Sequence, residues 1–92
     1  MKYLKIQWHH EEPEYPNLIY SEINEERWET RKLEFFPGGK VGYAYNNVEV
    51  GGTGLGLEPI PSIKDISSDP EFTPEEITKG EFERVWNEHV NS

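Results

Sequence analysis

The residues best suited to chemistry are two adjacent histidines followed by two glutamates, His9-His10-Glu11-Glu12. A histidine beside a carboxylate can act as a general acid–base pair, and histidines with acids can also hold a metal ion. Neighbouring strand residues point to opposite faces, so His9 and His10 are poorly placed to share a metal. A third ligand would have to be His89, and no ligand spacing supports it. We expect no metal site and no catalytic residue, with a small hydrolase or other enzyme using His10 as the alternative.

A glycine-rich segment, Gly51-Gly52-Thr53-Gly54-Leu55-Gly56, could in principle cradle a phosphate with backbone N–H groups. It lacks the Lys-Ser/Thr ending of a P-loop, and Glu58-Pro59 follows it in place of a helix start. Its spacing also differs from the dinucleotide-binding fingerprint. We therefore expect a structural turn or bulge here, and no cofactor.

A third candidate is a cluster of basic and aromatic residues that could bind nucleic acid. The cluster consists of Arg27, Trp28, Arg31 and Lys32, with Glu25, Glu26, Glu29 and Glu34 interleaved. The acids cancel the positive field that a phosphate backbone requires. We expect cross-strand ion pairs on an exposed sheet face, and no direct nucleic-acid binding.

The overall charge supports this exclusion. The chain carries 18 acidic against 9 basic residues, a net charge of −9, so phosphate backbones and anionic membranes would repel it. Residues 47–92 hold 10 acids and 3 bases, against 8 and 6 in residues 1–46, so nearly all the excess lies in the second half. A stretch with such an excess of acidic residues is commonly a solvated face that aids solubility. The alternative is a surface patch that binds a cationic partner.

Composition also limits the class of protein. There is no cysteine, which excludes disulfides, thiol catalysis and cysteine-bound zinc. The aromatic content of 13% argues against disorder, because these residues favour a core. We find no apolar signal segment and no membrane-spanning stretch, and we expect a cytoplasmic protein.

The 92 residues are expected to form a single domain, 1–92. Alternation in residues 2–10, and short apolar or mixed runs at 18–23, 27–36, 41–45 and 48–50, predict strands over about 2–50. Turn residues at 24–26 and 37–40 separate them. Consecutive strands joined by short turns predict an antiparallel meander of four to five strands.

Residues 51–72 are predicted to form a loop and a short helical turn, with Ser62 as its N-cap. Phe82, Val85, Trp86 and Val90 share one face of a C-terminal helix over about 78–91. Thr78 with Glu81 forms a capping box there, although Thr73 with Glu76 forms another. The expected fold class is α+β, with this helix packed on one sheet face. The predicted core consists of Leu4, Ile6, Trp8, Phe82, Val85 and Trp86.

The chain resembles a small bacterial domain family of largely unassigned function. The resemblance covers nearly the whole chain and is carried by Met1–Ile6, Trp8, Leu18–Glu22, Arg27–Glu29, Arg31-Lys32, Gly42–Ala44, Gly51–Thr53, Leu55-Gly56, Glu58–Pro61, Asp69–Phe72, Phe82-Glu83 and Val85-Trp86. His9 and the second glycine of Gly38-Gly39 depart from the family pattern. Such proteins look like immunity proteins of contact-dependent growth inhibition and other polymorphic toxin systems, and the resemblance supplies no catalytic residues.

We therefore expect an immunity protein, or antitoxin, that binds a basic toxin domain and neutralises it by occlusion without chemistry of its own. The expected toxin is a nuclease, since nucleases need basic clefts that an acidic inhibitor can exploit. A housekeeping protein-interaction domain is a further alternative. The expected partner-binding residues are Asp65, Asp69, Glu71, Glu75 and Glu76, with Tyr43 and Tyr45 or the Gly51–Gly56 loop as neighbours.

Overall fold

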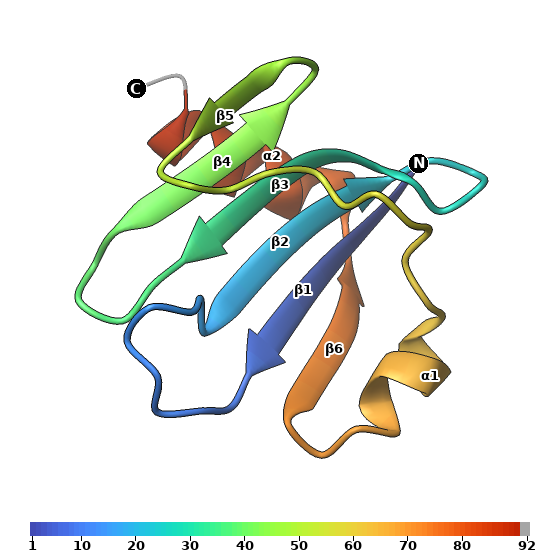
Figure 1. Cartoon of the computed structure of the whole chain (residues 1–92). Helices are drawn as coiled ribbons and strands as arrows, with labels where there is room; N and C mark the ends of the chain where they lie inside the picture. The colour runs from blue at the N-terminus through green and yellow to red at the C-terminus, as the bar shows by residue number, and fades with distance from the viewer. Residues whose placement is uncertain (91–92) are drawn as a thin grey trace.

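The computed structural model describes residues 1–90 and shows an α+β domain built on one sheet (Figure 1). The elements are β1 (Lys2–Trp8), β2 (Leu18–Ile23), β3 (Glu29–Phe35), β4 (Val41–Tyr45), β5 (Val48–Val50), α1 (Ile63–Ser67), β6 (Phe72–Ile77) and α2 (Lys79–His89). The strand order is β5-β4-β3-β2-β1-β6, and every neighbouring pair is antiparallel. The five-strand meander and the C-terminal helix agree with the sequence-based prediction.

The sheet has a sixth strand, which the sequence analysis did not predict. After β5 the chain crosses the sheet (Figure 1) and returns as β6 beside β1. The β6 sequence, Phe-Thr-Pro-Glu-Glu-Ile, contains a proline and two glutamates, which are all poor strand formers. Its conformation is set by pairing with β1, from Tyr3 opposite Ile77 to Trp8 opposite Phe72. Strand β3 is also shorter than predicted, because Arg27 adopts a positive φ of 68° in the preceding turn.

The local signals at turns and helix ends are confirmed. Gly38 and Gly39 have φ of 94° and 97° in the β3–β4 turn, a conformation that favours glycine. The Ser62 hydroxyl accepts from the Asp65 N–H at 3.1 Å, and the Thr78 hydroxyl accepts from the Glu81 N–H at 3.1 Å. Thr78 is therefore the N-cap of α2, and the alternative start at Thr73 is wrong because that residue belongs to β6.

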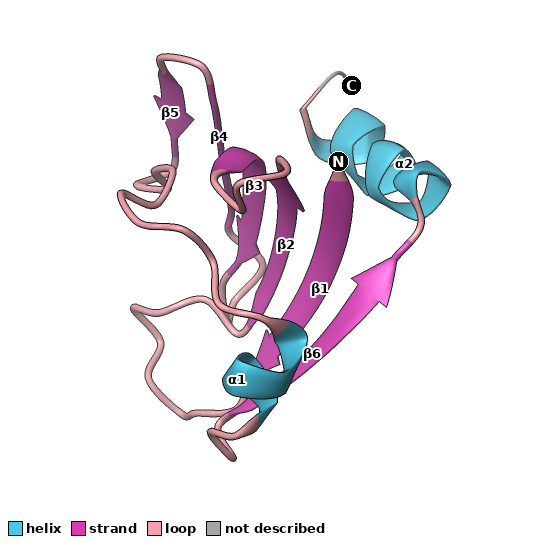
Figure 2. Ribbon diagram, turned by 90° about the vertical axis from the view of Figure 1, so that its right-hand side faces the viewer, coloured by secondary structure: helices cyan, strands magenta, loops and turns pink. Residues whose placement is uncertain are grey.

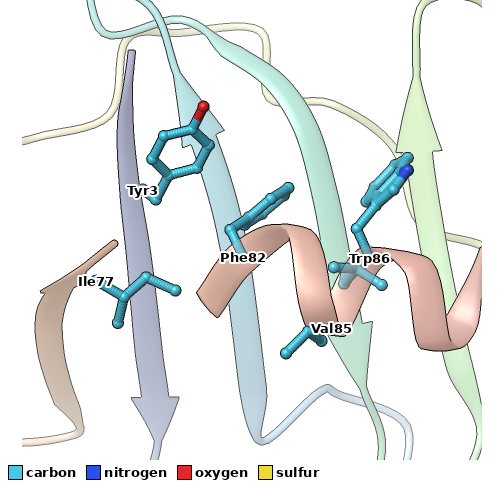
Figure 3. Close-up of a cluster of buried hydrophobic side chains, with 6 residues drawn as sticks. Tyr3, Ile77, Phe82, Val85 and Trp86 are labelled. Atoms are coloured by element: carbon cyan, nitrogen blue, oxygen red, sulfur yellow. The ribbon is translucent and has the colours of Figure 1, made fainter. Parts of the chain in front are cut away.

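The core has two parts on opposite faces of the sheet, where we had expected one. Helix α2 covers one face, called here the α2 face, through Phe82, Val85 and Trp86, which pack with Tyr3 and Ile77 (Figure 3). The opposite α1 face holds a second cluster, consisting of Leu4, Ile6 and Ile23 with Ile19, Ile60, Ile63, Ile66 and Phe72 around them. Figure 2 shows the two helices on opposite sides of the sheet.

The predicted core members are buried, with one exception. Leu4 and Ile6 are buried on the α1 face, and so are separated from the α2 residues with which we had grouped them. Trp8, at the end of β1, is only half-buried. It lies with the rings of His10, Tyr15 and Phe72 instead of within either cluster.

Candidate functional site: an acid-rimmed apolar cleft

The α1 face carries an open cleft of about 380 Å³ beside the second core cluster. Its lining is aliphatic and aromatic, with two carboxylates: Ile6, Ile19, Ile60, Pro61, Ile66, Phe72, Asp65 and Asp69. Strands β1 and β2 supply the floor, α1 and β6 one wall, and the segment that crosses from β5 to α1 the other. We call this the apolar cleft, and Asp65 and Asp69 its acidic rim.

The wall made by α1 is fixed by hydrogen bonds in the turn that leads into β6. One carboxylate oxygen of Asp69 accepts from the Glu71 N–H at 2.9 Å, and the Asp69 carbonyl accepts from the Phe72 N–H at 3.0 Å. Asp69 is therefore held by its own turn, as aspartates commonly are. This arrangement places a charged side chain at a defined position on the rim.

The opposite wall is held by Arg27, a residue that we had considered only as part of a basic cluster. Its guanidinium donates to the carbonyls of Ile60 at 2.7 Å and Pro61 at 2.6 Å. The Ile60 N–H in turn donates to the Arg27 carbonyl at 2.8 Å. Arg27 also adopts a positive φ, which is uncommon for a non-glycine residue, and this conformation could not be read from the sequence.

The acids predicted to bind a partner are all exposed, but they do not form one surface. Asp65 and Asp69 line the cleft, and Glu71 accepts from the Trp8 indole N–H at 3.3 Å near the same face. Glu76 lies opposite Leu4 and so shares the α1 face, whereas Glu75 lies opposite Lys5 on the α2 face. Asp65, Asp69 and Glu76 make no salt bridge within residues 1–90.

The two tyrosines lie elsewhere, so the prediction that they neighbour the acids is wrong. Tyr43 and Tyr45 belong to β4, and β3, β2 and β1 lie between that strand and β6. Both rings are half-buried against Trp86, at centroid distances of 6.1 and 5.5 Å. These ring contacts make both tyrosines part of the packing under α2.

The Gly51–Gly56 loop is likewise remote from β6 and serves a structural purpose. The buried Thr53 hydroxyl donates to Glu34 at 2.7 Å, and the Gly56 N–H donates to the buried carboxylate of Glu29 at 2.6 Å. Protein carboxylates thus occupy loop donors that a phosphate would need. The structural interpretation of this segment is confirmed, and the prediction that it borders the acidic residues is wrong.

The predicted ion pairs of β3 exist, but they are covered, not exposed as we had expected. On the α2 face, Arg31 donates to Glu22 at 2.9 and 2.6 Å and also pairs with Glu83. Its guanidinium lies 4.8 and 4.9 Å from the ring centroids of Phe82 and Trp86. Lys32, on the other face, lies 3.3 Å from the Glu29 carboxylate.

The Arg31 network shifts the titration of its members. Burial alone would raise the pKa of Glu22, but hydrogen bonds from Arg31 and Thr30 outweigh it and hold that pKa below its ordinary value. Hydrogen bonds to Glu22 raise the pKa of Arg31. Burial, together with the charge of Glu22, raises the pKa of the Tyr3 phenol. The network therefore keeps Tyr3 neutral and Glu22 ionised beneath α2, which is a structural role.

His10 is engaged through both of its ring nitrogens. Nδ1 accepts from the Glu12 N–H at 3.0 Å, and Nε2 lies 2.7 Å from the Pro16 carbonyl, to which it must donate. The ring also meets Trp8 edge to face at 4.7 Å. His9 contacts the Thr73 hydroxyl at 2.7 Å. Within residues 1–90, no three His, Cys, Asp or Glu side chains gather in a metal-binding arrangement.

The outer edge of β6 is poorly suited to adding another strand. The His9 N–H donates to the Glu71 carbonyl, so the alternating residues Phe72, Pro74 and Glu76 direct their backbone groups away from β1. Pro74 has no N–H, and the Phe72 N–H is already bonded to Asp69. This edge therefore offers few backbone groups for the addition of a strand.

The chain belongs to the family described as "Domain of unknown function (DUF6881)", whose family model matches residues 2–91. This confirms the resemblance to a small domain family without an assigned function. No curated protein and no solved structure gives a match. Among the helices of residues 1–90, none has the length and apolar character needed to cross a membrane.

Proposed function

We propose that this protein is a non-catalytic immunity protein, which binds a basic toxin domain, most simply a nuclease, and neutralises it by occlusion. The single observation that carries the proposal is the apolar cleft with Asp65 and Asp69 on its rim. Apolar surface contributes affinity, and surrounding charge selects a cationic partner and speeds association. Both features occur together on the α1 face.

The charge of the whole chain supports the same partner class. A net charge of −9 attracts a basic domain and repels nucleic acid. Glu71 and Glu76 extend the negative charge of the rim along the edge of the α1 face. A nuclease must present a basic cleft to phosphates, so an acidic inhibitor uses the field that draws in the substrate.

The enzyme alternative finds little support at His10. A general base needs a free nitrogen, and both nitrogens of His10 are bonded to backbone groups of the loop after β1. Through these two hydrogen bonds, His10 fixes the conformation of the 10–16 loop. A housekeeping interaction domain would use the same cleft, and it differs from our proposal only in its partner.

The test is co-expression in bacterial cells with a candidate toxin domain, chosen from the genes adjacent to this one. We expect the wild type and His10→Ala to restore growth, and Asp65→Asn/Asp69→Asn/Glu76→Gln to restore it less well. Loss of rescue by His10→Ala, with the variant folded, would favour the enzyme. Failure of the wild type to protect against any such toxin would favour the housekeeping alternative.

A further inference from the structure

The apolar cleft leaves part of the second core cluster open to solvent. Four isoleucines, Ile6, Ile19, Ile60 and Ile66, line it together with Phe72. Fixed apolar hollows of this kind are characteristic of binding sites, and about 380 Å³ lies within the range of ligand pockets. In the part of the chain that the structure describes, no hydrogen-bonding side chain other than the two rim aspartates lines it, so its apolar surface suits a methylene chain.

The rim provides charge at one end of this apolar surface. Asp65 belongs to α1 and Asp69 to the turn that follows it, and both line the cleft. Neither is within salt-bridge distance of a lysine or arginine in the residues that the structure describes, although Lys64 is adjacent on α1. Two carboxylates that lack a salt-bridge partner among the described residues, beside an apolar floor, favour a cation over an anion or a neutral group.

We propose that the cleft binds an aliphatic cation, namely a lysine or arginine side chain of the partner. The methylene stem lies on the isoleucine floor, and the charged head meets Asp65 and Asp69. Long basic side chains commonly bury their stems along apolar surface while the head remains at a polar boundary. This inference rests on the proposed function in identifying the partner as a basic protein, and it adds the group that anchors that partner.

The test uses three probes of six carbon atoms each with different heads: hexylammonium, hexanol and hexanoate. Each is titrated into wild-type protein labelled at isoleucine δ1-methyl groups and followed by NMR. We expect hexylammonium to bind with a dissociation constant on the order of millimolar and to shift the cleft methyls of Ile6, Ile19, Ile60 and Ile66. Ile77 lies in the core under α2 and should not shift, which provides an internal control.

The charged rim is tested separately from the apolar floor. We expect hexylammonium to bind roughly three- to fivefold more tightly than hexanol, and hexanoate to bind most weakly. Asp65→Asn/Asp69→Asn should abolish this order, and Glu75→Gln, on the other face, should preserve it. Equal binding of hexanoate and hexylammonium, or shifts that include Ile77 as strongly as the cleft methyls, would overturn the proposal.

The outcome is separable from that of the proposed function. If hexylammonium does not enter the cleft while the protein still neutralises a basic toxin, the anchoring inference fails and the proposed function stands. If hexylammonium binds as expected while no toxin is neutralised, the cleft is an aliphatic-cation site and the proposed function fails. The two results therefore distinguish failure of the anchoring inference from failure of the proposed function.

Discussion

Glu75 and Glu76 are adjacent in the chain, and their side chains lie on opposite faces of the sheet. Glu75 lies opposite Lys5 of β1 on the α2 face, and Glu76 lies opposite Leu4 on the α1 face, which carries the cleft. Both side chains are exposed. The same charge change made at each position therefore tests which face a partner meets, while the net charge of the protein stays equal between the two variants.

The first prediction uses this pair. Glu76→Gln should slow association with a basic toxin domain by about twofold at low ionic strength, because exposed charges near an interface chiefly set the association rate. Glu75→Gln should associate close to the wild-type rate. Stopped-flow kinetics across a salt series measures this, with the difference shrinking as salt screens it. Equal slowing by both variants would mean that only the net charge matters.

The second prediction concerns the ion pairs under α2. Arg31→Met should reduce the free energy of unfolding by about 3 kcal/mol, because it leaves the poorly exposed carboxylate of Glu22 without its partner. Arg84→Met is the matched control, since Arg84 pairs with Glu88 on the exposed surface of α2. There we expect a change below about 0.5 kcal/mol. Urea unfolding at neutral pH measures both, and similar losses would contradict a special role for Arg31.

The third prediction is the pH dependence of stability. The pKa of Glu22 is lower in the folded protein than its ordinary value of 4.5, so the unfolded chain binds the proton more readily. The stabilisation from Glu22 is therefore fully present above about pH 4.5 and is lost as the pH falls through the folded-state pKa. In unfolding curves between pH 7 and 3, Glu22→Gln should show a shallower loss on acidification than the wild type. An identical slope would contradict this assignment.

The fourth prediction compares two glycines. A Cβ at Gly42 would lie 2.1 Å from the Thr53 hydroxyl, so Gly42→Ala should displace the 51–56 loop and cost about 1–3 kcal/mol. A Cβ at Gly80, in the first turn of α2, meets only the Thr78 hydroxyl at 3.9 Å. Gly80→Ala should therefore stabilise the protein by about 0.5 kcal/mol. Melting temperatures that move in the same direction for both would contradict the packing described here.

Local signals in the sequence predicted the elements that depend on local interactions. The glycines of the β3–β4 turn and the caps at Ser62 and Thr78 specify backbone conformation within a few residues. Strand β6 forms instead because it pairs with β1, and its own residues have a low propensity for strands. For this reason the meander and both helices could be predicted, and the sixth strand could not.

The candidate site could likewise be predicted from local sequence signals only in part. The acidity of Asp65 and Asp69 is visible in the sequence, but the apolar cleft beside them requires Ile6 and Ile19 to be brought there from the start of the chain. The separation of Tyr43 and Tyr45 from the acids likewise follows from strand order, which short-range patterns do not specify. Side chains alternate between the two faces along a strand, so Glu75 and Glu76 lie on opposite faces. This separation follows from the sequence only once residues 72–77 are known to form a strand.

The central claim is that the protein neutralises a basic toxin by binding and covering it. The most direct measurement is a titration of the activity of a candidate basic toxin domain, chosen from the genes adjacent to this one, with increasing amounts of this protein. The account predicts that activity falls linearly to an end point at equimolar protein, and that high salt slows the onset of inhibition. Full inactivation by a small fraction of an equivalent would indicate turnover, and undiminished activity in excess protein would indicate no such partner; either result would contradict the account.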